Sequence, residues 1–462
     1  MSDLSPETAQ PPSPNAGAKG HVREILSHRG FRRLLTSRIA SQLADGFFQA
    51  GLAVSVFFNP NSQIEPMAYA IAFAMLAAPY SILGPYVGVF LDRWSRRNII
   101  VVSNLIRATA MIPVALLIGT GGPEWAFASL ALVAITINRF VLAGLSAAQP
   151  HVVAPDNLVT ANSFATTAGT MSFGAGLGAS YVVIQAFTHL PGDARYAATI
   201  AVAVPLYALA AAVAWASFTR AGLGPDENER ATGHILAAIV ATTRGMINGF
   251  GHLWQRRGSA YVMGVQAGHR ALYGILTVFT LAVFRGHFHD PASHPEFGDT
   301  LAWLAAIAAA GQVGSFLAAL ITPRLSRALG PGRWVTFLMI GMTAITAVLG
   351  LYIVELAFVV GVLLINIVSQ GTKIVVDTSL QSNCADIFRG RLFSLNDTVF
   401  NLSFIVGLFA GASVIPSDGY APWIVFVTAG GYALMCTWFA FASRRHAPYV
   451  RHASRPGSPA GQ

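Results

Sequence analysis

Apolar residues run along most of this chain in long stretches that are separated by short polar segments. A stretch of about 20 apolar residues suffices to cross ~30 Å of hydrocarbon, and roughly twelve can be counted. They are solidly apolar and do not alternate at every second residue, so they predict membrane-spanning helices and not a strand barrel. The expected spans are 36–58, 67–91, 98–120, 124–148, 158–187, 194–219, 259–284, 300–322, 334–354, 355–381, 392–415 and 421–443. The ninth and tenth abut at Glu355, which leaves their boundary open.

Ionisable side chains interrupt these spans in a regular rhythm. A charge in hydrocarbon costs a few kcal/mol or more, so such residues tend to face a water-filled path or a partner. Most fall on the first helix of successive groups of three: Asp45 on the first span, Arg139 on the fourth, His269 and Arg270 on the seventh, and Lys373 and Asp377 on the tenth. Arg107 on the third span is the exception. The rhythm predicts a central polar cavity.

Composition and charge support a membrane protein. Of 462 residues 54% are hydrophobic and 11% are charged, whereas soluble domains carry about 25% charged residues. The net charge is +9, but the arginines gather at alternate span ends, which indicates orientation in a membrane and argues against nucleic-acid binding. The clusters are Arg23, Arg29, Arg32, Arg33 and Arg38; Arg93, Arg96 and Arg97; Arg324, Arg327 and Arg333; Arg389 and Arg391; and Arg444, Arg445 and Arg451. By the positive-inside rule, both termini are cytoplasmic.

The chain is internally duplicated. Arg93 after the second span recurs as Arg324 after the eighth, and Ser163 recurs as Ser394, each 231 residues later. Two parallel halves of six helices produce such an offset. We therefore expect an all-α membrane protein with about twelve transmembrane helices in two six-helix pseudo-repeats.

The halves are expected at 31–220 and 258–444. Residues 1–30 and 445–462 are rich in small and polar residues and are expected to be disordered. The cytoplasmic linker 221–257 contains apolar residues whose spacing fits a helix on the membrane surface, and a plain linker is the alternative. These residues are Ile235, Leu236, Ile239, Met246, Phe250, Leu253 and Trp254.

The loop after the second span reads Gly88-x-x-x-Asp92-Arg93-x-x-Arg96-Arg97. It resembles the G-x-x-x-D-R-x-G-R-R/K signature of the major facilitator superfamily, with Ser95 in place of the second glycine. Weaker likenesses lie elsewhere between residues 31 and 444. Arg139 and Gly144 resemble an R-x-x-x-G element with one extra residue. A glycine-rich motif of antiporters is similar to the fifth span, which contains Gly169, Gly174, Gly176 and Gly178. The Gly-Pro pair of that motif is missing from this chain. The run from Arg389 to Asp397 is similar to exporters of the enterobactin-exporter and macrolide-efflux type.

The resemblance implies a cytoplasmic gate. In the superfamily, the aspartate of this loop docks against the start of span eleven, where a helix N-terminus offers unpaired N–H groups and partial positive charge. Asp92 is then expected to latch the cytoplasmic side. The alternative is that the loop charges only fix topology. The candidate gate residues are Gly88, Asp92, Arg93, Arg96, Arg97, Arg391, Asn396 and Asp397.

The candidate residues for substrate binding or proton coupling lie deeper. Asp45 lies roughly 13 Å into span one, with Arg139 at a similar level on span four, so the two can pair. The superfamily resemblance places spans one and four on the cavity. Asp45 is therefore our leading proton-coupling carboxylate, and a permanent salt bridge that ties the first half together is the alternative.

The second half supplies two neighbouring pairs. His269 and Arg270 point about 100° apart on span seven, so at most one faces the cavity squarely. A neutral His269 satisfied by a nearby hydroxyl is the alternative to a proton-handling role. Lys373 and Asp377 lie four residues apart, hence on one helix face where they can pair, for structure or for transport.

We expect a secondary active transporter that works by alternating access, most simply a proton-coupled exporter of small amphipathic or hydrophobic molecules. An importer or facilitator is the first alternative, and a non-transporting membrane protein or intramembrane enzyme is the second. The chain shows no H-E-x-x-H, G-x-S-x-G or P-loop motif, so no enzyme, metal site or cofactor is expected. The expected partners are a small-molecule substrate, protons and membrane lipid, but no nucleic acid, for a monomer that crosses the inner (plasma) membrane several times.

Overall fold

The computed structural model describes residues 24–57, 65–190, 193–225, 234–288, 297–384, 386–416 and 419–445. These residues are helical throughout, with short turns and without strands. The predicted disordered segments fall largely outside the described residues, although 24–27 are helical and Ile25 packs against Phe31.

Each predicted span corresponds to a helix. The first half contains α2 (Arg29–Phe57), α3 (Pro66–Ile82) continued by η1 (Gly84–Tyr86) and α4 (Val87–Leu91), α5 (Arg96–Gly119), α6 (Glu124–Ala147), α7 (Leu158–Ala186) and α8 (Ala194–Ser217). The turns η2 (Gln149–His151) and η3 (Pro155–Asn157) join α6 to α7. The second half contains α10 (Arg257–Val283) with η4 (Phe284–Phe288), α11 (Phe297–Leu329), α12 (Pro331–Leu351), α13 (Glu355–Asn383), α14 (Asp386–Ala412) and α15 (Pro422–Arg445).

Ten described helical stretches are long and apolar enough to cross a membrane. α2 and α7 are not among them, because α2 carries Arg38 and Asp45 and α7 is rich in Thr, Ser and Gly. The boundary that the sequence left open near Glu355 is now placed, since α12 ends at Leu351 and α13 begins at Glu355.

Glycine pairs hold equivalent helices together in the two halves. In the first half, Gly46 of α2 lies against Gly176 of α7, and a Cβ on either would run into the backbone of the other helix. In the second half, Gly274 of α10 and Gly407 of α14 approach the facing backbone in the same way. Gly176 and Gly407 are 231 residues apart, the offset of the sequence repeat. The contact supports the two-repeat arrangement.

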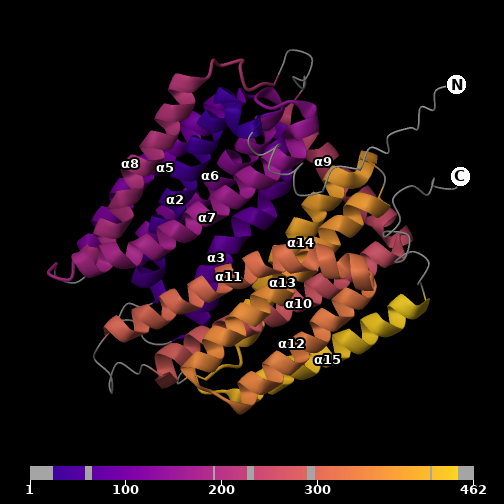
Figure 1. The fold of residues 1–462 in the computed structure, drawn as a ribbon. Helices are drawn as coiled ribbons and strands as arrows, with labels where there is room; N and C mark the ends of the chain where they lie inside the picture. Colours follow the sequence, from indigo (N-terminus) through magenta and orange to yellow (C-terminus); the bar gives the residue numbers. More distant parts are fainter. Residues whose placement is uncertain are drawn as a thin grey trace, which may run out of the picture.

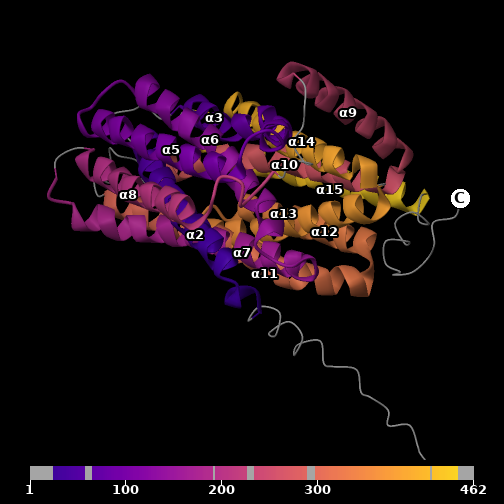
Figure 2. The same ribbon diagram turned by 90° about the horizontal axis from the view of Figure 1, so that it is seen from above.

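The two halves diverge toward one side of the molecule. In Figure 1 they lie close at the lower left and separate toward the upper right, where α2 begins and α15 ends. We call this side the α9 face, because α9 (Ile235–Gln255) lies on it (Figure 2). Deeper inside, α3 packs against α14, and Phe73 meets Phe404 edge-on at 6.4 Å between ring centroids.

α9 contacts both halves. The hydroxyl of Thr243 hydrogen-bonds to the hydroxyl of Tyr86 in η1 at 3.0 Å. Gly245 faces α14 so closely that a Cβ there would lie 2.7 Å from Nε of Arg391. The helix predicted for this segment is therefore present, and the alternative of a plain linker does not hold for residues 235–255.

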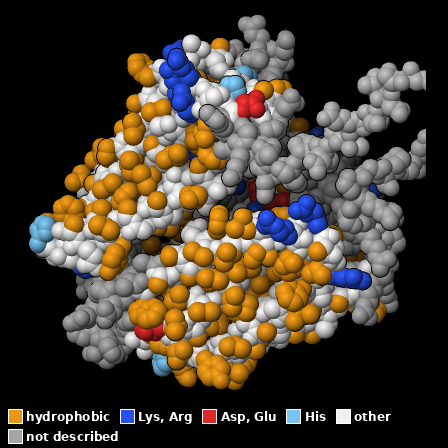
Figure 3. Space-filling model, viewed as in Figure 1, with side chains coloured by type: hydrophobic (Ala, Val, Ile, Leu, Met, Phe, Trp, Pro, Cys, Tyr) orange, Lys and Arg blue, Asp and Glu red, His pale blue; other side chains and the backbone are white. Residues whose placement is uncertain are grey.

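The outer surface is apolar, as expected for contact with lipid. In Figure 3 hydrophobic side chains cover both lobes, whereas Lys and Arg side chains gather near the ends of the lobes. Acidic side chains are visible in the hollow between the lobes (Figure 3).

Candidate functional site

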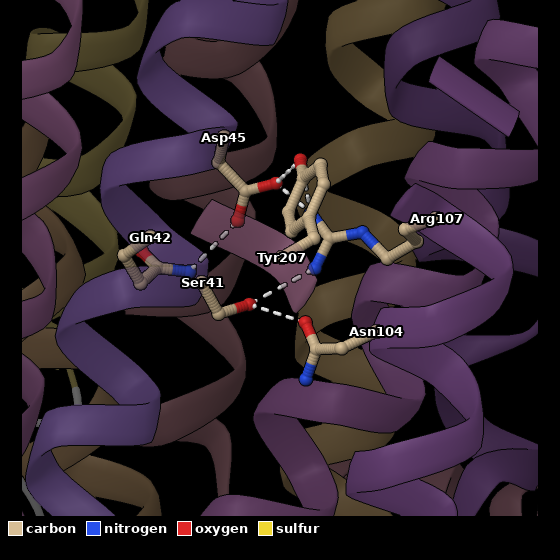
Figure 4. A network of polar contacts seen from close by, with 6 residues as sticks. All are labelled: Ser41, Gln42, Asp45, Asn104, Arg107 and Tyr207. Atoms are coloured by element: carbon tan, nitrogen blue, oxygen red, sulfur yellow. Dashed lines mark hydrogen bonds and ion pairs between the residues drawn. The ribbon is translucent and has the colours of Figure 1, made fainter. Parts of the chain in front are cut away.

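Asp45 lies at the centre of a buried polar network in the first half (Figure 4). Its Oδ1 atom accepts hydrogen bonds from the Arg107 guanidinium and from the Tyr207 hydroxyl, the latter at 2.8 Å. Its Oδ2 atom accepts a hydrogen bond from Gln42 at 3.2 Å. The carboxylate is thus fully paired within the first half, between α2, α5 and α8.

Arg107 completes this network. Its guanidinium donates to the Tyr207 hydroxyl at 2.7 Å and to Ser41 at 3.1 Å, and it lies 4.0 Å from the centroid of the Tyr207 ring. Ser41 in turn donates to Asn104 at 2.9 Å. Arg107 is only 1% exposed, so the charge is tolerated because the network satisfies it.

The predicted pairing of Asp45 with Arg139 is wrong. Asp45 pairs with Arg107, because α2 packs closely against α8, and α8 against α5, and so Arg107 and Tyr207 reach the carboxylate. Arg139 extends instead toward the end of α3, where its guanidinium lies 3.2 Å from the position of a Cβ on Gly84. Asp45 forms an ion pair with Arg107 inside the first half, and its role in proton coupling stays a prediction.

A second charged group lies between α13 and α14. Nζ of Lys373 lies 3.3 Å from Asp377 and 3.6 Å from Asp397, so one ammonium serves two carboxylates. Asn396 donates to Asp377 at 3.3 Å. The predicted contact of Lys373 with Asp377 is confirmed. The three charged side chains are 29%, 36% and 48% exposed, so water reaches the cluster.

Arg270 lies beyond this cluster on α10, surrounded by aromatic rings. Its guanidinium carbon is 4.0 Å from the ring centroid of Phe400, 4.3 Å from Phe404 and 5.0 Å from Tyr273. Nζ of Lys373 lies 5.4 Å from the same Phe400 ring. The two cations therefore share one aromatic side chain, and Phe404 links this group to Phe73 of the first half.

His269 points away from Arg270. It is completely buried, and its ring lies 6.0 Å from that of Tyr273 and 5.7 Å from that of Tyr432. The Tyr432 hydroxyl donates to the backbone carbonyl of His269, and neither ring nitrogen has a hydrogen-bond partner in the part of the chain that the structure describes. On the sequence alone, a nearby hydroxyl was expected to hydrogen-bond to the imidazole. The Tyr432 hydroxyl bonds to the backbone carbonyl of His269 instead.

The candidate gate residues do not meet in this conformation. The carboxylate of Asp92 is exposed and makes no polar contact among the described residues, and a Cβ on Gly88 would meet open space. Asn396 and Asp397, assigned to the gate from the sequence, contact the Lys373 cluster. Arg391 lies beside α9. The latch that the resemblance implies is therefore not formed here.

The loop arginines contact the ends of neighbouring helices. Arg96 donates to the backbone carbonyl of Ala147 at 3.1 Å, and Arg97 donates to that of Trp215 at 3.0 Å. Arg93 donates to its own helix at Val89. Cations at helix C-termini satisfy unpaired carbonyls and favour the helix dipole. Ser95, at the position of the signature glycine, caps α5 by accepting from the backbone of Asn98.

A model of the Major Facilitator Superfamily matches residues 39–407. The chain belongs to this superfamily. Uncharacterised MFS-type transporters of Mycobacterium tuberculosis and Mycobacterium bovis are each 35% identical to it over 434 residues, which are 93% of this chain and 94% of each relative. The chain is therefore a membrane transporter of the superfamily, which points to a non-enzymatic function.

Solved structures of the superfamily share the fold. The structure of the nucleoside transporter NupG matches with a TM-score of 0.66 at 13% sequence identity. The match covers 90% of this chain and 99% of the NupG chain. A bacterial homologue of the iron transporter ferroportin, in an inward-facing state, matches with a TM-score of 0.58 at 16% sequence identity. The match covers 90% of this chain and 98% of that protein's chain. At these identities the likeness shows the fold alone.

The sequence did not identify the aromatic residues around Arg270. Phe400 and Phe404 lie on one face of α14, four residues apart, but an apolar helix contains many phenylalanines at such spacings. The sequence did not identify Tyr207 as a partner of Asp45 and Arg107 either. The available signal was the need of each deep cation for a partner, which points toward aromatic or acidic residues without saying which.

Proposed function

We propose that this superfamily member is a proton-coupled exporter of small amphipathic or hydrophobic molecules that works by alternating access. The α9 face is cytoplasmic in this proposal, since the arginine clusters lie there. The molecule then opens toward the cytoplasm, with the Lys373 cluster and Arg270 between its halves. An opening on that side would admit a substrate from the cytoplasm.

The observation that carries the proposal is the sharing of Lys373 by two carboxylates. Asp377 and Asp397 together carry one negative charge more than Lys373 balances. One proton can bind to this group and leave a neutral ion pair, which is far less costly to enclose than a net charge. Closure of the α9 face would remove water from the cluster, so closure would favour the protonated form.

The same reasoning gives the direction of coupling. In the conformation open to the α9 face, water reaches both carboxylates and stabilises the unprotonated form. A proton acquired from the opposite side would therefore be released at the α9 face, where substrate enters. Substrate and proton would travel in opposite directions, as an exporter requires.

A transport assay in everted vesicles with an acidic interior tests this proposal. Carboxyfluorescein, Nile red and rhodamine 6G serve as anionic, neutral and cationic probes. We expect the parent to concentrate at least one probe inside the vesicles, and expect Asp377→Asn/Asp397→Asn to lose this accumulation while retaining downhill exchange. Glu65→Gln is the matched control, because the Glu65 carboxylate is exposed on the opposite face and makes no polar contact among the described residues.

Each other outcome identifies an alternative. Equilibration that ignores the pH gradient would indicate a facilitator. Loss of probe from loaded vesicles along the same gradient would indicate an importer. If the double variant accumulates probe at the parental rate, other residues carry the proton coupling. Asp45 is then the next candidate.

A further inference from the structure

Arg270 differs from the other deep cations in having no acidic or hydrogen-bonding partner among the described residues. Arg107 is paired with Asp45, and Lys373 is paired with Asp377 and Asp397. Only the Nε atom of Arg270 is buried without a partner, so its terminal nitrogens are not enclosed. These nitrogens form the end of the guanidinium that binds two oxygens of a carboxylate or phosphate.

A comparison with Arg38 shows that the location of an arginine decides whether a transported molecule can reach it. Arg38 also has no hydrogen-bond partner at two of its nitrogens, but it is 7% exposed and packs against Gly169 of α7 within the first half. Arg270 is half-buried at the boundary between the halves, where Phe404 of its site meets Phe73. An arginine in that place is accessible to a transported molecule.

The three rings around Arg270 hold the charge without neutralising it. Phe400, Phe404 and Tyr273 offer their faces to the guanidinium, and such contacts position a cation in a membrane protein while leaving its charge uncompensated. An uncompensated cation at membrane depth is costly, and an anionic ligand removes that cost. Phe400, which is partly exposed, also offers a flat apolar surface beside the charge.

We propose that Arg270 binds the anionic group of the transported substrate, and that the substrate is an organic anion with a flat apolar body. The carboxylate, phosphate or sulfonate pairs with the terminal nitrogens of Arg270. The body lies against Phe400, next to the contact of Phe404 with Phe73. This proposal rests on the proposed transport function, because it names the substrate class of the same central site.

The neighbouring cluster supports this class. The ammonium of Lys373 already serves two carboxylates, so it adds little attraction for a second negative group. Asp377 and Asp397 repel anions with widely spaced charges. A single anionic group at one end of an apolar body fits this arrangement better than a polyanion does.

Binding to the purified full-length protein in phosphatidylcholine nanodiscs tests the proposal without any gradient. Isothermal titration calorimetry compares 2-naphthoate, 2-naphthyl phosphate and 2-naphthalenesulfonate with the neutral 2-naphthamide, which has the same rings. We expect at least one anion to bind the parent at least tenfold more tightly than the amide. Arg270→Gln should remove that preference, and Arg270→Lys should keep part of it.

The controls separate binding from folding. Arg324→Gln is the matched control, because Arg324 is exposed on α11 and its hydrogen bond among the described residues is to Leu320 of its own helix. Phe400→Leu should weaken the amide and the anions alike, since it removes the partly exposed ring and not the charge. Thermal unfolding of each variant shows that it is folded. The comparison of anion with amide in the parent needs no variant.

Three outcomes overturn the proposal: no anion binds the parent better than the amide, Arg270→Gln retains the preference, or Arg324→Gln loses it equally. The test is independent of transport. Anion binding without export would support this site and contradict the proposed function. Export without any preference for anions would do the reverse.

Discussion

Arg107 and Arg139 illustrate how far depth alone can place a charge. Asp45, Arg107 and Arg139 each lie nine residues from the same side of their predicted spans, so all three are at about the same level in the membrane. Depth therefore cannot distinguish the two arginines as partners. The structure selects Arg107, because α5 and α8 surround the buried face of α2.

The Asp45 pair gives a prediction for stability. Arg107→Met or Asp45→Asn alone leaves one buried charge without its partner, and each should destabilise the folded protein by about 3–5 kcal/mol. Asp45→Asn/Arg107→Met should cost clearly less than the sum of the two. A double-mutant cycle on thermal unfolding in detergent measures this coupling.

The matched cycle uses Asp45→Asn with Arg139→Met, which are not in contact. Its two effects should add within about 0.5 kcal/mol. If Asp45 couples to Arg139 as strongly as to Arg107, the ion pair that the structure shows is not the one that stabilises the protein.

Sequence predicted some residue contacts and not others. The pairing of Lys373 with Asp377 follows from four-residue spacing on one helix, which fixes the geometry locally. The contacts of Asp397 with Lys373, and of Phe400 with Arg270, join different helices. They depend on how the helices are rotated about their axes, which an apolar pattern specifies only loosely.

Among the elements, α9 has a surface that the rest of the protein leaves uncovered. Leu236, Ile247, Phe250 and Trp254 are 72%, 67%, 51% and 69% exposed along one side of the helix. Arg244 and Asn248 lie on another side of the helix, beside a groove of about 650 Å³ whose lining also includes Arg391, Leu236 and Val240. A helix with one apolar and one polar side typically lies in the membrane interface.

We predict that the apolar side of α9 enters the lipid headgroup region. A spin label at Ile247→Cys, in a background without Cys384 and Cys436, should be more accessible to oxygen than to a water-soluble nickel chelate. The same label at Asn248→Cys should show the opposite preference, because the two side chains point about 100° apart. Power-saturation electron paramagnetic resonance measures both. Equal accessibility at the two positions would place α9 in water.

The elements themselves were largely predictable from sequence. Runs of about 20 apolar residues located the helix of each of the twelve predicted spans, including α2 and α7, whose polar residues lower their hydropathy. The break near Glu355 was insecure because apolar residues continue through it. The helix of α9 was left open against a plain linker, since a short amphipathic pattern carries less signal than a membrane span.

At the scale of the whole molecule, the sequence implied a latch that this conformation does not contain. Asp92 is exposed, and the start of α14 is occupied by contacts with α9. A sequence specifies contacts of several conformations at once, whereas a structure shows one of them. The latch remains a prediction for the conformation closed at the α9 face.

Asp92→Asn should therefore shift the resting population toward the conformation open at the α9 face, because it weakens a contact made only when that face is closed. Cysteines in place of Arg93 and Ser394 should crosslink less readily in this variant than in the parent background. Glu65→Gln should leave the yield unchanged. Equal yields with and without Asp92 would leave this carboxylate with a role in topology only.

Glycines bring α2 close to α7 in the first half and α10 close to α14 in the second. Each half should therefore move as a rigid body. Helices whose backbones touch at Gly46, Gly176, Gly274 and Gly407 cannot slide past one another without a clash. Motion is then concentrated where α3 meets α14, with Phe73 and Phe404 near the fulcrum. The arm from Phe73 to the end of α4 is about 27 Å long. A rotation on the order of 15° would move its tip by about 7 Å, so small changes in contact at the fulcrum suffice to open or close the far end.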